Sequence, residues 1–113
     1  MIMHALISIL FSLGMPVLFA QTVTDVDGNV YNTVSIGSQT WLKENLKVRH
    51  NPDGTDIINL WSYQNDTSLI STYGFLYDWN AAMNGSTGEG SQGICPEGWH
   101  IPTDSEWSVL GEY

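Results

Sequence analysis

The sequence of 113 residues is short of cysteine and of positive charge. It holds one cysteine, Cys95, and three lysine and arginine residues against twelve aspartate and glutamate residues, so the formal net charge is −9. A single cysteine excludes an internal disulfide framework and a zinc site built from several thiolates. An acidic chain of this kind is not expected to bind nucleic acid or an anionic membrane surface as its main partner.

Aliphatic residues are also scarce once the first 20 residues are set aside. The chain has, however, five tryptophans and five tyrosines, and each of these side chains can bury a large area. The composition therefore predicts one small, loop-rich domain with a thin aliphatic core that is completed by aromatic side chains.

Residues 1–20 predict a cleaved signal peptide. The apolar run ALISILFSLGMPVLFA is short for a membrane span, is not followed by stop-transfer charges, and ends in the small residue Ala20. The alternative is a retained N-terminal anchor helix, because no lysine or arginine precedes the run. We expect residues 21–113 to be secreted, periplasmic or at the cell surface, without a stable membrane anchor.

Three strands are predicted over residues 22–26, 29–36 and 39–48. Asp27-Gly28 and Gly37-Ser38 lie between them and are typical of tight hairpin turns, since glycine accepts a positive φ. Within the second strand Val30, Val34 and Ile36 share one face by the period of two. In the third strand Leu42, Leu46 and Val48 alternate with polar residues.

Two helices are predicted after these strands. Phe75, Trp79 and Met83 are spaced four residues apart, which favours a helix over residues 76–83. Thr103 and Glu106 match the capping box, so a second helix is expected to begin at Asp104 and to bury Trp107. Strands followed by helices in separate blocks indicate an α+β domain.

Most tryptophans lie in patterned segments and are expected to be buried, namely Trp41, Trp79, Trp99 and Trp107. Trp61 and Tyr63 lie instead in the poorly patterned region of residues 55–72. They are the candidate ligand-binding residues, because exposed aromatic rings can stack on sugars.

Three stretches together resemble one family: TDVDGNVYNTVSIGSQTWLKENLKV, YGFLYDWNAAM and GICPEGWHIPTDSEW. They are similar to the Fibrobacter succinogenes major paralogous domain, from about Thr24 to the end of the sequence. The last stretch carries the residues of the family's structural motif: Cys95, Pro96, Gly98, Trp99, His100, Pro102, Thr103, Glu106 and Trp107.

This resemblance implies an exported or surface-associated bacterial protein without an established catalytic activity. It also implies a fold similar to the C-type lectin-like and formylglycine-generating-enzyme group. Family domains continue past the second helix with further strands and a late cysteine. The resemblance thus implies that residues 21–113 are the front part of an incomplete domain, in which Cys95 would normally be bridged to that late cysteine.

Two glycine-containing and acidic patterns suggest cofactor or metal sites, but simpler structures explain them. Residues 88–93 satisfy GxGxxG, yet a helix rather than a strand is predicted before them, so a flexible surface loop is expected. Asp25, Asp27 and Asn29 lack the partners of a calcium loop at Val30 and Ile36, and a hairpin turn accounts for them. We expect no cofactor and no metal.

Cys95 and His100 offer a possible nucleophile and base, but formylglycine-generating enzymes, by resemblance, work with a pair of cysteines. A buried thiol or half of a structural disulfide is favoured for Cys95, and a hydrogen-bonded, half-buried role for His100. Lys43, Lys47 and Arg49 hold all the positive side-chain charge. Pairing with nearby carboxylates is favoured there over an anion site.

These patterns predict a non-catalytic extracellular or surface module that binds carbohydrate or protein, or has a structural role. The partners would be extracellular polysaccharide or a surface protein. The alternatives are a relative of the formylglycine-generating enzymes and a purely structural adhesin segment. The ligand-binding residues expected for the first hypothesis are Trp61 and Tyr63.

Overall fold

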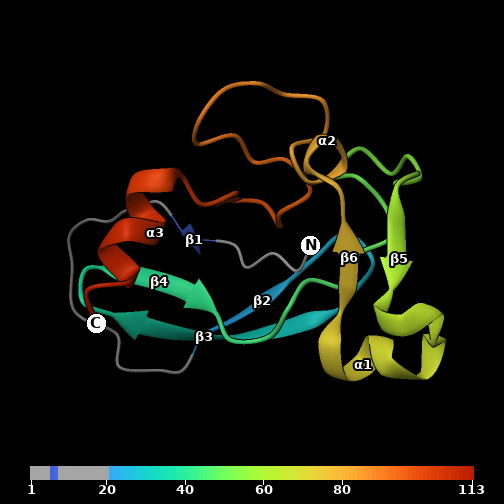
Figure 1. Ribbon diagram of the computed structural model, residues 1–113, viewed down its shortest axis with the longest axis horizontal. Coiled ribbons are helices and arrows are strands. Elements are labelled where there is room, and N and C mark those ends of the chain that lie inside the picture. Colours follow the sequence, from blue (N-terminus) through green and yellow to red (C-terminus); the bar gives the residue numbers. More distant parts are fainter. Residues whose placement is uncertain (1–5, 8–20) are drawn as a thin grey trace.

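Two small antiparallel sheets form the framework of the protein (Figure 1). The computed structural model describes residues 6–7 and 21–113. The larger sheet has the strand order β2-β3-β4-β1-β7, and the smaller sheet pairs β5 with β6. The strands are β1 (Leu6–Ile7), β2 (Thr22–Thr24), β3 (Val30–Ile36), β4 (Gln39–Leu42), β5 (Leu60–Ser62), β6 (Phe75–Tyr77) and β7 (Trp99–His100).

The helices are short and lie around the two sheets. Figure 1 shows α1 and α2 at opposite ends of the β5–β6 pair, whereas α3 lies beside β4. The helical elements are η1 (Tyr63–Asn65), η2 (Thr67–Leu69), α1 (Ile70–Tyr73), α2 (Trp79–Ala82) and α3 (Asp104–Leu110). This confirms the predicted α+β class. Within the described residues no helix has the length and apolar character needed to cross a membrane.

The two predicted hairpins are confirmed. β2 pairs with β3 around Gly28, which has a φ of 86°, and β3 pairs with β4 around Gly37, which has a φ of 62°. Both glycines therefore take backbone conformations that other residues adopt only at a cost.

β4 ends at Leu42, six residues before the predicted end of the third strand. The Glu44 carboxylate accepts a hydrogen bond of 2.7 Å from the backbone amide of Asn32 on β3. That side chain takes the donor that a longer β4 would have used, so the ladder stops there. Leu46 and Val48 are nevertheless buried, as the alternating pattern indicated.

β3 does not bury the face that carries Val30. Val30 is 56% exposed, whereas its neighbour Tyr31 is completely buried. Val34 and Ile36, further along the strand, are half-buried. Tyr31, on the opposite face of β3, points into the interior, because its hydroxyl hydrogen-bonds to the Asp25 carboxylate and the Lys47 amide there.

The helix predicted over residues 76–83 is wrong at its start. Phe75–Tyr77 forms β6, paired with β5 in the register Leu60↔Tyr77, and only Trp79–Ala82 is helical. The Asp78 side chain caps this single turn by accepting a hydrogen bond of 2.7 Å from the amide of Ala81. Pairing with β5 thus overrides the helical spacing of the apolar residues.

The second predicted helix is confirmed, and its capping box is complete. The Thr103 hydroxyl accepts from the Glu106 amide at 3.2 Å, and Glu106 Oε2 accepts from the Thr103 amide at 2.8 Å. Trp107 and Trp79 are not buried as predicted, since they are 40% and 54% exposed. The Trp107 ring contacts Trp41, at 4.9 Å between ring centroids and a tilt of 50°, while Trp79 is the first residue of the single-turn helix α2.

The core lies between the two sheets and includes the loop that contains Cys95. Trp41 and Trp99 are buried as predicted. The main cluster joins aromatic and aliphatic side chains from both sheets: Tyr31, Leu42, Leu46, Val48, Ile57, Phe75, Tyr77, Ala82, Met83, Ile94, Cys95, Trp99 and Ile101.

β1 lies between β4 and β7 and connects them. Leu6 is paired with both Trp41 and His100, and Ile7 is paired with Trp99. These two residues belong to the predicted signal peptide, of which residues 1–5 and 8–20 lie outside the described residues. The connection between β4 and β7 therefore depends on a segment that export would remove.

We predict that a protein beginning at Gln21 exchanges the backbone amide hydrogens of β4 and β7 faster than the full chain, because the pairs with β1 are lost. Hydrogen–deuterium exchange followed by mass spectrometry measures this difference. Equal protection in the two proteins would contradict the connecting role of β1.

A second prediction concerns Gly93, where the loop after α2 passes close to the core. Gly93 has a φ of 55°, and an added Cβ would lie 2.1 Å from the Ala82 carbonyl oxygen. Gly93→Ala should lower the free energy of unfolding by about 2–4 kcal/mol, from backbone strain and overpacking. Gly90→Ala is the control, because Gly90 also has a positive φ but faces open space. Urea unfolding should show a clearly smaller loss for this control, and equal losses would refute the close contact.

Candidate functional site

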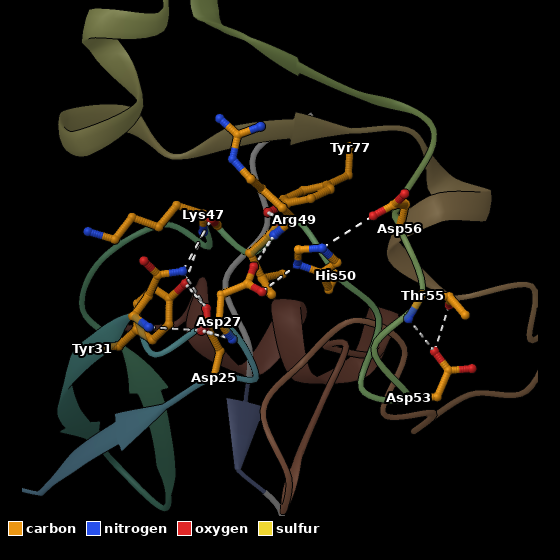
Figure 2. A network of polar contacts seen from close by, with 12 residues as sticks. Asp25, Asp27, Tyr31, Lys47, Arg49, His50, Asp53, Thr55, Asp56 and Tyr77 are labelled. Atoms are coloured by element: carbon orange, nitrogen blue, oxygen red, sulfur yellow. Dashed lines mark hydrogen bonds and ion pairs between the residues drawn. The ribbon is translucent and has the colours of Figure 1, made fainter.

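A network of polar side chains connects the β2–β3 turn with residues 47–56 (Figure 2). Asp25 is 7% exposed and accepts four hydrogen bonds. Its Oδ1 accepts from the amides of Asp27 and Asn29 at 2.9 and 3.0 Å, and its Oδ2 accepts from Asn29 Nδ2 at 3.0 Å and from the Tyr31 hydroxyl at 2.7 Å. With four donors, the hydrogen-bonding capacity of this buried carboxylate is satisfied by the protein itself.

The Tyr31 hydroxyl extends the network into the core. It donates to Asp25 and accepts a hydrogen bond of 3.0 Å from the Lys47 amide. Burial, and then the nearby Asp25 carboxylate, raise the pKa of Tyr31 well above its ordinary value, so the hydroxyl keeps its proton. Burial likewise raises the pKa of Tyr77, whose hydroxyl donates to the Val48 carbonyl at 2.8 Å.

Asp27 and His50 form the exposed part of the network. His50 lies between two carboxylates, with Nδ1 2.5 Å from Asp27 Oδ1 and Nε2 3.2 Å from Asp56 Oδ1. Asp27 Oδ2 also accepts from the Arg49 amide at 2.6 Å. Partial burial acts to raise the pKa of Asp27, but the hydrogen bonds from Arg49 and His50 outweigh it and hold the pKa below the usual range.

Within the described residues, the hydrogen bonds of this network stabilise the fold. Asp25 and Asp27 direct their oxygens at backbone and side-chain donors of the protein itself. In residues 6–7 and 21–113 no group of three or more histidine, cysteine or acidic side chains could hold a metal ion. The prediction of a hairpin turn at Asp27-Gly28 is thus confirmed.

The prediction that Lys43, Lys47 and Arg49 pair with carboxylates is wrong. Each ion pair within the described residues involves a histidine. The Arg49 guanidinium lies instead over the Phe75 ring, 4.8 Å from its centroid. The neighbouring carboxylate of Asp27 accepts from the Arg49 backbone amide, so the side chain is left to pack on the aromatic ring.

The residues of the CPEGWH motif form a turn and a short strand. The Trp99 amide donates to the Pro96 carbonyl at 3.0 Å, and Gly98 has a φ of 86° at the third position of this turn. Cys95 is 1% exposed, and burial raises the pKa of its thiol, which opposes a nucleophilic thiolate.

His100 is held by the capping residue of α3. Its Nε2 lies 2.9 Å from both oxygens of Glu106, the same carboxylate that accepts from the Thr103 amide. His100 is hydrogen-bonded as predicted and is more deeply buried than expected, at 7% exposure. Among the described residues no hydrogen bond joins it to Cys95.

The segment with the GxGxxG pattern is a loop, as predicted. Residues 88–93 lie between α2 and β7, without a preceding strand or a following helix. Gly93 serves the close approach to Ala82 described above, and Gly90 faces open space.

An exposed aromatic surface lies on the β5–β6 sheet. Trp61 is 50% exposed and Tyr63 is 41% exposed, so both lie at the surface as predicted. Ser62 between them is extended, with φ −84° and ψ 150°, and therefore places both side chains on the same side of the chain. Phe75 and Tyr77 of β6 point the other way, into the core.

Tyr73 completes this surface and was not identified from the sequence. It is 43% exposed, and its ring centroid lies 5.4 Å from that of Tyr63. It is positioned by α1 and by its carbonyl, which accepts from Asn45 Nδ2 at 3.1 Å. We call Trp61, Tyr63 and Tyr73 the aromatic face.

A comparison with protein-family models places most of the chain in one family. Residues 34–113 match the model of the Fibrobacter succinogenes major domain. The chain belongs to this family. Searches of curated proteins and of solved structures found no match. The likeness to C-type lectin-like and formylglycine-generating folds therefore stays a prediction.

The matched residues contain two of the features described above. They include the β5–β6 sheet with the aromatic face and the motif from Cys95 to Trp107. The acidic turn at residues 25–29 lies before the matched residues.

We predict that Tyr31→Phe lowers the free energy of unfolding by about 2–3 kcal/mol, because the Lys47 amide and one Asp25 oxygen lose a buried partner. Urea unfolding measures the loss. The matched control is Tyr63→Phe, whose ring lies at the surface. A Tyr31→Phe protein as stable as this control would contradict the role of the network.

The lowered pKa of Asp27 predicts a loss of stability in acid. Because the pKa is lower in the folded than in the unfolded chain, Asp27 stabilises the fold above its unfolded pKa. That contribution is lost as the pH falls through the folded pKa. Asp27→Asn should therefore flatten the decrease in urea midpoint between about pH 5 and about pH 2. An unchanged pH profile would show that the contacts of Asp27 do not favour its charged form.

Proposed function

We propose that this protein is an exported, non-catalytic surface module that binds carbohydrate through its aromatic face. The observation that carries the proposal is the pair of exposed rings Tyr63 and Tyr73, 5.4 Å apart between centroids, together with the exposed Trp61 of β5 two residues before Tyr63. A protein gains little by exposing several large aromatic side chains together unless a partner covers them.

The charge of the protein supports a neutral partner. A formal net charge of −9 opposes binding to anionic polymers. The Arg49 guanidinium lies over the Phe75 ring, on the side of β6 that faces the core. Tryptophan and tyrosine rings suit the apolar faces of neutral sugars.

The non-catalytic assignment rests on the groups that chemistry would use. The thiol of Cys95 is buried and its pKa is raised, while His100 is engaged by Glu106. A formylglycine-generating activity would need a reactive thiolate, which this environment disfavours. Export rests on the sequence pattern of residues 1–20.

We predict that the full chain binds neutral glycans on an array and that Trp61→Ala weakens this binding at least tenfold, through the loss of ring stacking. Trp107→Ala is the matched control, because it removes another exposed tryptophan far along the chain, on α3. Binding that is insensitive to Trp61→Ala would contradict the aromatic face as the site. Failure of the full chain to bind any glycan would leave the purely structural adhesin segment as the better hypothesis.

A further inference from the structure

A hollow rich in asparagine lies next to the β5–β6 sheet, where the chain enters β5 and leaves β6. Its volume is about 340 Å³. Asn59 directly precedes β5, and Asn80 belongs to α2, which follows β6. We call it the asparagine hollow, and its polar lining is Asn51, Asp56, Asn59, Asn80 and Asn84.

Some of these polar groups are used within the protein. Asn51 Nδ2 donates to the Thr55 hydroxyl at 3.0 Å, and Asn59 Nδ2 donates to Asp78 Oδ2 at 2.8 Å. Asp56 contacts His50. These contacts explain the polar residues of the loop without a ligand.

The carboxamides of Asn80 and Asn84 are different. Neither side chain makes a hydrogen bond to another described residue, and both line the hollow from the α2 side. A carboxamide presents a donor and an acceptor side by side, which matches the neighbouring hydroxyl groups of a sugar ring. The two side chains thus offer a neutral, directional pair of hydrogen-bonding groups.

The rest of the lining restricts the ligand further. Ile58 is 87% exposed at the hollow and offers an apolar contact for the C–H face of a sugar. Among the described residues no lysine or arginine lines the hollow, and Asp56 adds a negative charge. Uronic, sulfated and phosphorylated sugars would therefore be disfavoured.

We infer that the asparagine hollow binds a neutral sugar unit through Asn80 and Asn84, and that the same glycan continues onto the aromatic face. This inference rests on the proposed function and extends its site. The segment from Asn59 to Ser62 spans about 10 Å, so the hollow and Trp61 lie within reach of one oligosaccharide.

The test uses the full chain on an array that carries neutral oligosaccharides and their carboxylated or sulfated counterparts. The double variant Asn80→Ala/Asn84→Gly removes both carboxamides, and glycine suits position 84, where φ is 51°. Affinity for neutral glycans should fall about tenfold, while the thermal unfolding midpoint stays within a few degrees of the unaltered protein. Asn65→Gly is a matched control, because Asn65 has a φ of 55° and does not line the hollow.

The outcomes separate this inference from the proposed function. If Trp61→Ala weakens binding but the double variant binds like the unaltered protein, the hollow is not part of the site and the proposed function stands. Preference for acidic over neutral glycans would overturn the inference, because the hollow carries the negative charge of Asp56 and no lysine or arginine lines it among the described residues. Absence of glycan binding by the unaltered protein would overturn both.

Discussion

Buried hydrogen bonds that begin at the Asp25 carboxylate and the Tyr31 hydroxyl connect the first hairpin with residues 47–48 and, through Tyr77, with β6. The Tyr31 hydroxyl donates to Asp25 and accepts a hydrogen bond from the Lys47 amide. The carbonyl of the next residue, Val48, accepts a hydrogen bond from the Tyr77 hydroxyl of β6. The smaller sheet is therefore positioned by a chain of buried polar contacts that begins in the first hairpin turn. Because unpaired buried groups are costly, these contacts specify one arrangement of the sheets and fix which side of β5–β6 faces outward.

Local signals in the sequence predicted the features that local chemistry determines. The turn at Asp27-Gly28 needs a positive φ, and the capping box at Thr103 and Glu106 satisfies the first amides of α3. The prediction of a helix over residues 76–83 was wrong at its start, because β6 forms by pairing with β5, about 15 residues earlier in the chain. The burial predicted for Trp107 was also wrong, because its ring contacts Trp41 of β4 but remains 40% exposed.

The candidate site was predictable only in part. Trp61 and Tyr63 stood out because their segment lacks an amphipathic pattern, and both are exposed. Tyr73 joins them only through the fold, which brings α1 beside η1. Nothing in the sequence indicated a binding role for Asn80 and Asn84, because asparagine is also typical of turns and helix ends, and Asn84-Gly85 predicted only the end of a helix. The fold brings their carboxamides together, since both line the hollow beside α2.

We propose that the aromatic face and the asparagine hollow together bind a neutral glycan. Nuclear magnetic resonance titration of the isotope-labelled full chain with a mixture of neutral oligosaccharides would detect this binding residue by residue. We expect shifts of the Trp61 indole N–H and of the Asn80 and Asn84 carboxamides, while the buried indoles of Trp41 and Trp99 stay unchanged. An unchanged spectrum, or shifts confined to residues outside this surface, would contradict it.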